Sequence, residues 1–162
     1  MTEGRVEGLN ERSFGEKLAG VEYRDRVGAY AIIFDAELKV PVVQTSTGCF
    51  LLGGGLDAGE SHADCIRREC LEEAGLAVDV GPLVCKGDKY HWSDTLGYYM
   101  HGVGYFYLAK SHGQVATPKE EDHELVWMAA EQCIDSLFLE HQAWAVEQAL
   151  RLVGNAEELK RD

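Results

Sequence analysis

Three glutamates, Glu69, Glu72 and Glu73, constrain this chain more than any other feature of its sequence. They lie within residues 60–74, a segment in which apolar side chains recur every three or four positions, as an amphipathic helix requires. Ser61 can cap the start of this helix, and Gly75 can end it. Because residues three and four apart lie on the same side of a helix, the sequence predicts one face that carries all three carboxylates.

Like charges at this spacing destabilise an isolated helix, so something must offset their repulsion. The neighbouring cations Arg67 and Arg68, together with solvent, are one source of compensation. A bound divalent metal ion is the other, because carboxylate oxygens are hard ligands that suit magnesium or manganese. The three glutamates alone leave both interpretations open.

The residues around the glutamates extend the pattern in both directions. Gly54 is followed six positions later by Glu60, and Arg68 comes eight positions after Glu60. At these intervals the segment resembles the signature of the Nudix hydrolase family, which requires glycine, glutamate, arginine and a final aliphatic residue there. The matching residues are Gly54, Glu60, Arg68, Glu69, Glu72, Glu73, Gly75 and Leu76.

Two positions depart from this signature. Cys70 stands where the family has an aliphatic residue, but cysteine packs as a small apolar side chain. The family's usual Leu-Pro-Gly-Gly reads Leu-Leu-Gly-Gly at residues 51–54, so the turn lacks its proline. Neither departure removes a catalytic group.

The resemblance implies an α/β fold, a Nudix-type α/β/α sandwich with a mixed sheet and a loop–helix–loop catalytic motif. It implies that Glu69, Glu72 and Glu73 ligate Mg²⁺ or Mn²⁺, with a further oxygen from the Gly54 carbonyl. It also implies that two residues hold these carboxylates in place from outside the ligand set, namely Glu60 and Arg68.

Family members often take one more carboxylate from a loop that precedes a later strand. That loop here includes Glu120 and Glu121, ahead of Trp127, and Glu121 is the preferred candidate as a ligand. The implied reaction is attack of water on a diphosphate, in which metal ions neutralise charge and lower the pKa of water. A glutamate then accepts the proton, and both Glu72 and Glu121 remain candidates for this general base.

The rest of the chain predicts one domain. We expect an N-terminal extension at residues 1–20, a Nudix domain at 21–153 and a solvated tail at 154–162. Hydrophobic runs predict strands, a glycine-rich break is expected at 53–55, and a second amphipathic helix is expected at 136–153. The predicted strands are residues 27–34, 39–45, 48–52, 77–90, 98–108 and 123–128.

Substrate selection must come from residues outside the signature. Tyr90 and Trp92 fall in a segment that reads as a loop, where their rings could stack on a nucleotide base. The alternating Tyr99, Tyr105 and Tyr107 are more typical of a sheet face. A nucleoside triphosphate, a dinucleoside polyphosphate and a nucleotide sugar all remain open as substrates.

Charge and composition limit the kinds of substrate and binding partner that we expect for this protein. A net charge of −13 disfavours binding to nucleic acid polymers, so we expect a small phosphorylated, nucleotide-like substrate. The polar N-terminus and the lack of a long apolar segment predict a cytoplasmic protein without membrane insertion. Five cysteines without a Cys-x-x-Cys pair give little support to disulfides or to a zinc site. A homodimer stays open.

Two readings compete with an active diphosphohydrolase. One is a catalytically silent Nudix-like sensor that binds a nucleotide, and the other is an isomerase on the same scaffold. Such sensors commonly lose carboxylates of the signature, whereas all are present here. The cysteine and glutamate pattern expected of the isomerase is not apparent.

Overall fold

The computed structural model describes residues 9–118 and 123–161, with side chains up to Gly154. Within these residues, seven strands form one sheet in the order β1-β5-β6-β2-β4-β3-β7. The strands are β1 (Glu11–Phe14), β2 (Arg24–Ile33), β3 (Lys39–Gln44), β4 (Cys49–Gly55), β5 (Leu76–Ser93), β6 (Tyr98–Gln114) and β7 (Glu124–Ala129). The helices are α1 (His62–Ala74), α2 (Ala130–Ser136) and α3 (Glu140–Arg161).

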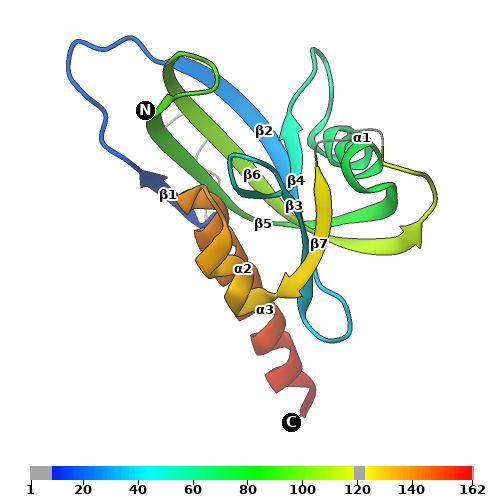
Figure 1. Cartoon of the computed structure of the whole chain (residues 1–162). Helices are drawn as coiled ribbons and strands as arrows, with labels where there is room; N and C mark the ends of the chain where they lie inside the picture. Colours follow the sequence, from blue (N-terminus) through cyan, green and yellow to red (C-terminus); the bar gives the residue numbers. More distant parts are fainter. Residues whose placement is uncertain (1–8, 119–122, 162) are drawn as a thin grey trace.

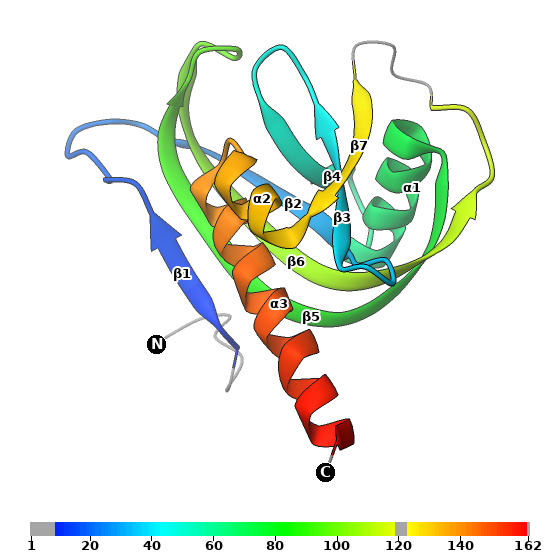
Figure 2. The same cartoon turned by 60° about the horizontal axis from the view of Figure 1, so that its bottom comes forward.

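The sheet is mixed. Strand β2 runs parallel to β6 and antiparallel to β4, while the short β1 runs parallel to β5 at one edge. Helix α1 lies on one side of the sheet, and α2 and α3 lie on the other (Figure 1). Figure 2 shows α3 crossing the concave side of the long β5 and β6 strands. These layers confirm the predicted α/β fold.

Side chains of β2 alternate between two hydrophobic cores, because successive residues of a strand point to opposite faces. Ala31 and Ile33 pack in the core on the α1 side, which also contains Ile66. Ile32 packs in the core on the other side, which contains Trp144 of α3. The sheet is therefore buried on both faces near β2.

Strand β4 changes partner along its length. Residues 49–51 pair with β3, whereas residues 52–55 pair with β2. Two backbone N–H groups at this transition bond to side chains from opposite helices instead. Leu51 N donates to Gln142 Oε1 of α3, and Gly53 N donates to Glu73 Oε1 of α1, each at 2.9 Å. Both helices are thus tied to one short stretch of β4.

The predicted break at residues 53–55 was wrong, because these glycines belong to β4. These glycines are required because neighbouring atoms lie close to them, and not because the chain turns there. A Cβ on Gly53 would lie 2.4 Å from the Ala29 carbonyl oxygen, and Gly53 has a φ of +142°. A Cβ on Gly54 would lie 2.9 Å from Glu69 Cδ. Glycine therefore lets β4 run directly against α1 and β2.

The second predicted helix differs at both ends. The backbone extends at Leu137, and Phe138 N bonds to Cys49 O, which separates α2 from α3. Gly154 was expected to end the helix, but α3 continues to Arg161. A Cβ at Gly154 would meet nothing within 4 Å, so no contact forces the chain to turn there. At the other end of the chain, residues 11–14 add β1 to the sheet.

Candidate active site

Helix α1 begins and ends where its sequence predicts. The Ser61 hydroxyl accepts a hydrogen bond from Asp64 N at 3.1 Å, which caps the first turn. Gly75 ends the helix in the left-handed region, with φ of +66°. A Cβ there would come 2.0 Å from the Ala116 carbonyl oxygen, so the adjoining chain also requires glycine.

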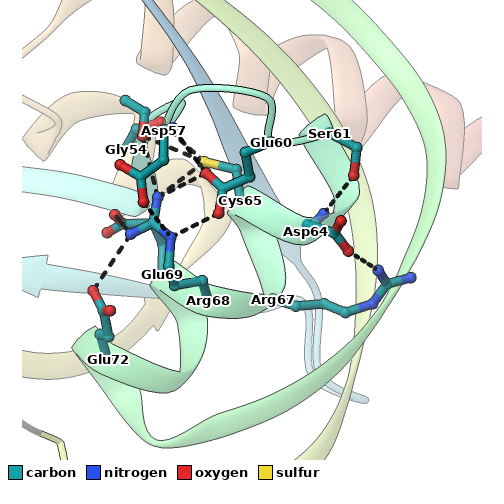
Figure 3. Close-up of polar contacts among 11 residues, drawn as sticks. Gly54, Asp57, Glu60, Ser61, Asp64, Cys65, Arg67, Arg68, Glu69 and Glu72 are labelled. Carbon is teal, nitrogen blue, oxygen red and sulfur yellow. Dashed lines mark hydrogen bonds and ion pairs between the residues drawn. The ribbon is translucent and has the colours of Figure 1, made fainter.

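Arg68 lies at the centre of the acidic side chains around α1 (Figure 3). Its Nε and Nη2 donate to the two oxygens of Glu60 at 2.8 and 2.9 Å, a bidentate pair. Its Nη1 donates to Glu69 Oε1 at 2.6 Å and lies 3.5 Å from Glu72 Oε2. Arg68 Nε also lies 3.3 Å from Asp57 Oδ2, so one guanidinium compensates for charge repulsion among four carboxylates.

Glu60 is fixed by two donors. Besides Arg68, the backbone N–H of Asp57 donates to Glu60 Oε1 at 3.0 Å. The hydrogen bonds from Arg68 and Asp57 lower the pKa of Glu60 to about 2, so it remains ionised at neutral pH. Arg68 Nη2 also donates to the Gly55 carbonyl at 3.2 Å. The Glu60–Arg68 pair thereby links the loop before α1, the helix and β4.

Glu69 and Glu73 reach from α1 to β4. Glu73 is buried and accepts the hydrogen bond from Gly53 N, while the Glu69 carboxyl packs against Gly54. Cys65, on the same helix, donates its thiol to the Gly54 carbonyl at 3.3 Å. Two of the three helix glutamates expected to bind metal, Glu69 and Glu73, thus lie against Gly54 and its neighbour Gly53.

The candidate ligand atoms are of the chemical kind that binds a hard divalent cation. They are carboxylate oxygens together with the Gly54 carbonyl, the ligand type that magnesium and manganese prefer. Within residues 9–118 and 123–154, however, no three His, Cys, Asp or Glu side chains are arranged as a ready-made metal site. The positive charge next to Glu69 and Glu72 comes from Arg68, which contacts both carboxylates.

A cavity of about 720 Å³ opens beside these carboxylates. Glu73 and Gly54 form part of its wall, and Tyr30, Phe50 and Phe138 contribute aromatic surface. The sequence did not single out these three aromatic residues, because they come from three separate segments. Glu73 is the one Asp or Glu among the described wall residues, and the cavity brings it together with this aromatic surface.

Two of the wall residues, Tyr30 and Arg26, come from β2. Tyr30 stacks on Phe106 with ring centroids 5.4 Å apart, and burial raises the pKa of its phenol to about 12. Arg26 is the one arginine or lysine among the described wall residues. Its Nε lies 3.2 Å from where a Cβ on Gly55 would stand, so glycine leaves room for the guanidinium.

Tyr90 and Trp92 were expected in a loop, but they lie in β5. Their neighbours His91 and Ser93 line the cavity, whereas Tyr90 and Trp92 do not. Tyr90 stacks on His101 at 4.2 Å between centroids, and Trp92 is 49% exposed. Strand alternation explains the difference, because adjacent residues of β5 face opposite ways.

The loop carboxylates Glu120 and Glu121 lie outside the described residues. His123, the first described residue after them, forms part of the cavity wall. No described helix is long and apolar enough to cross a membrane.

Comparison with known proteins identifies the family and the fold. The family model of the NUDIX domain matches residues 24–150. A MutT NUDIX hydrolase from Burkholderia pseudomallei is 29% identical, with a TM-score of 0.60 over 77% of this chain and 98% of its own. No protein in the curated set is similar enough to count as a match.

Two further solved structures share the fold at lower identity. An ADP-ribose pyrophosphatase from Streptococcus suis is 24% identical, with a TM-score of 0.59 over 79% of this chain and 91% of its own. The NUDIX domain of Shewanella oneidensis NrtR, solved with ADP ribose, is 18% identical, with a TM-score of 0.62 over 82% and 90%. Because the family model covers most of the sequence, the chain belongs to the NUDIX domain family and is a hydrolase of the Nudix type.

Proposed function

We propose that this protein hydrolyses a diphosphate bond in a small nucleoside-diphosphate-linked substrate, with the help of a divalent metal ion. The observation that carries the proposal is the shared cavity: Glu73 and Gly54 line the same space as Tyr30, Phe50 and Phe138. A diphosphate would lie beside Glu73 and Gly54 once its charge is neutralised, and a base would lie beside the aromatic side chains. MutT and ADP-ribose pyrophosphatase relatives support this substrate class.

The residues that would hold Mg²⁺ or Mn²⁺ are Glu69, Glu72 and Glu73, with the Gly54 carbonyl and, on the loop, Glu121. When bound, the metal would neutralise phosphate charge and make water more acidic. Glu60 and Arg68 position these ligands through the bidentate pair between them. An ion pair of this kind fixes side-chain direction as well as charge.

The other residues act on the substrate itself. Arg26 is placed to bind a phosphate oxygen, because it is the cation of the described cavity wall. Water adds to one phosphorus, the bond from that phosphorus to the bridging oxygen breaks, and the bridging oxygen leaves with the other phosphate. Glu72 or Glu121 accepts the proton of the attacking water. The aromatic side chains exclude bulk water from the base.

Chain organisation and location follow as part of this proposal. Residues 21–153 form the catalytic domain, which contains the matched range 24–150, with an extension at 1–20 and a tail at 154–162. We place the protein in the cytoplasm, acting on a small phosphorylated nucleotide-like molecule rather than a nucleic acid polymer. Its strongly negative charge supports the second assignment.

The test is a panel of nucleoside triphosphates, dinucleoside polyphosphates and nucleotide sugars, each incubated with Mg²⁺ and analysed by chromatography. We expect cleavage at a diphosphate bond in at least one class. Exhaustive chelation should abolish turnover, and added Mg²⁺ should restore it. Undiminished turnover after chelation would contradict the metal mechanism.

A nucleotide-binding sensor is the alternative, since the NrtR domain was solved with ADP ribose. The complete set of signature carboxylates favours the enzyme. Saturable nucleotide binding without product release, across the whole panel, would decide for the sensor.

A further inference from the structure

The start of α3 contributes two buried polar side chains to the cavity wall, His141 and Gln142. Gln142 is 1% exposed and His141 is 3% exposed. The same wall contains Phe50 and Phe138, in ring contact at 5.7 Å between centroids, and Leu139. Buried polar groups usually have a hydrogen-bond partner.

The amide oxygen of Gln142 has a structural role. Its Oε1 accepts the hydrogen bond from Leu51 N at 2.9 Å, at the point where β4 leaves β3. Because an amide nitrogen cannot accept this bond, the orientation of the amide is determined. No described residue accepts a hydrogen bond from the Nε2 group, which carries two protons.

His141 also carries a polar atom whose hydrogen-bonding capacity is unused among the described residues. Its Nδ1 has no hydrogen-bond partner among the described residues, although the atom is buried. Burial lowers the pKa of this imidazole to about 4, so the ring is neutral at physiological pH. The wall formed by α3 therefore offers hydrogen bonds without offering charge, as suits an uncharged heterocyclic base rather than a phosphate.

We propose that Gln142 selects the base of the substrate by donating a hydrogen bond from Nε2 to a carbonyl oxygen. This inference rests on the proposed function, which gives the substrate class. It adds which base of that substrate the protein prefers. Since Oε1 is already occupied by Leu51, Gln142 can donate to the base but cannot accept from it. A purine with a 6-carbonyl satisfies this donor, whereas the 6-amino group of adenine would set donor against donor.

Gln142 could instead serve only as a cap for Leu51, in which case it would affect stability but not base preference. Inosine and adenosine monophosphates separate these roles, because they differ at position 6 of the base. The purely structural role predicts equal affinity for both nucleotides. Selection through Nε2 predicts a preference for the inosine nucleotide in the wild-type protein.

The experiment measures both dissociation constants by calorimetry with the full chain in Mg²⁺ buffer. We expect inosine monophosphate to bind about 10-fold more tightly, the size of one hydrogen bond plus the avoided donor–donor contact. Gln142→Met keeps the side-chain volume but removes the donor, so the ratio should fall towards one. Gln148→Met is the matched control on the same helix, because Gln148 accepts from Asn10 at 2.6 Å and does not line the cavity.

The ratio of affinities is the readout, because loss of the Leu51 hydrogen bond would weaken both complexes alike. Equal affinities in the wild type, binding of neither nucleotide, or an unchanged ratio in Gln142→Met would each overturn the inference. Tighter inosine monophosphate binding without hydrolysis of any panel compound would refute the proposed function and leave the base selection standing.

Discussion

Glu73 of α1 and Gly53 of β4 are joined by a hydrogen bond, with 2.9 Å between Glu73 Oε1 and Gly53 N. This backbone N–H belongs to the stretch of β4 that no longer pairs with β3. Glu73 therefore has a structural partner in addition to its proposed role as a metal ligand. The two roles separate by substitution, since only one of them depends on charge.

Glu73→Gln should remove most of the activity while the fold stays intact. The amide oxygen can still accept from Gly53 N, but the charge that attracts a hard cation is lost. We expect kcat to fall by at least about 100-fold. Loss of a residue that only supports a metal ligand costs up to about this factor, so loss of a ligand should cost no less. Steady-state kinetics and thermal melting measure the two effects. Full activity with parental melting would show that Glu73 is not a ligand.

Glu73→Ala is the comparison that exposes the structural role. It leaves the buried Gly53 N–H without its acceptor, which costs roughly 1–3 kcal/mol of unfolding free energy. A Glu73→Ala variant as stable as Glu73→Gln would refute that role.

Arg68→Lys should weaken the response to Mg²⁺. Lysine keeps the charge but cannot make the bidentate contact with Glu60 while also reaching Glu69. We expect the Mg²⁺ concentration for half-maximal activity to rise about 10- to 100-fold. Arg67→Lys is the matched control, because Arg67 is exposed and pairs only with Asp64 among the described residues. An equal response in both variants would remove Arg68 from the positioning role.

Glu121→Gln should lower kcat by roughly 10²- to 10⁴-fold if Glu121 is the general base. Because Glu121 lies outside α1, in a segment that the sequence predicts as a loop, we expect little change in metal binding to the free enzyme. Glu120 is near enough in sequence to substitute in part, so Glu120→Gln and the double variant belong in the same series. Wild-type kcat in the double variant would exclude this loop from catalysis and leave Glu72 as the preferred base.

His141 should make the protein less stable as the pH falls from about 6.5 to about 4. Burial, with the charges of Lys89 and His91, lowers the folded-state pKa to about 4, whereas the unfolded value is near 6.5. The unfolded chain therefore binds more protons in this window, and acidification favours unfolding. His141→Leu should flatten this part of the pH dependence of the melting temperature.

An exposed histidine provides the control for that measurement. His112 is 49% exposed, so His112→Leu removes a histidine from the surface and serves as the comparison. If His141→Leu melts with the same pH dependence as the parent between pH 7 and 4, burial of a neutral His141 is not what the acid transition reports.

The central helix and its acidic face were predictable from sequence, because each depends on neighbours a few positions apart. Ser61 and Gly75 set the ends of α1 through local backbone geometry, and the i, i+3, i+4 spacing of Glu69, Glu72 and Glu73 follows from the helical repeat. The family signature implied that Glu60 and Arg68 hold the carboxylates in place, whereas the two hydrogen bonds that join them to each other came from the structure.

The cavity depended on contacts between distant segments. Tyr30, Phe50 and Phe138 meet only after the strands have paired, and Gln142 reaches Leu51 across 91 residues of chain. Tyr90 and Trp92 appeared suited to a base, yet the register of β5 turns them away from the cavity. Sequence spacing thus determined α1 and its acidic face, whereas only the tertiary structure decided which residues line the cavity. The side of a sheet that a residue faces depends on register and on packing against remote elements.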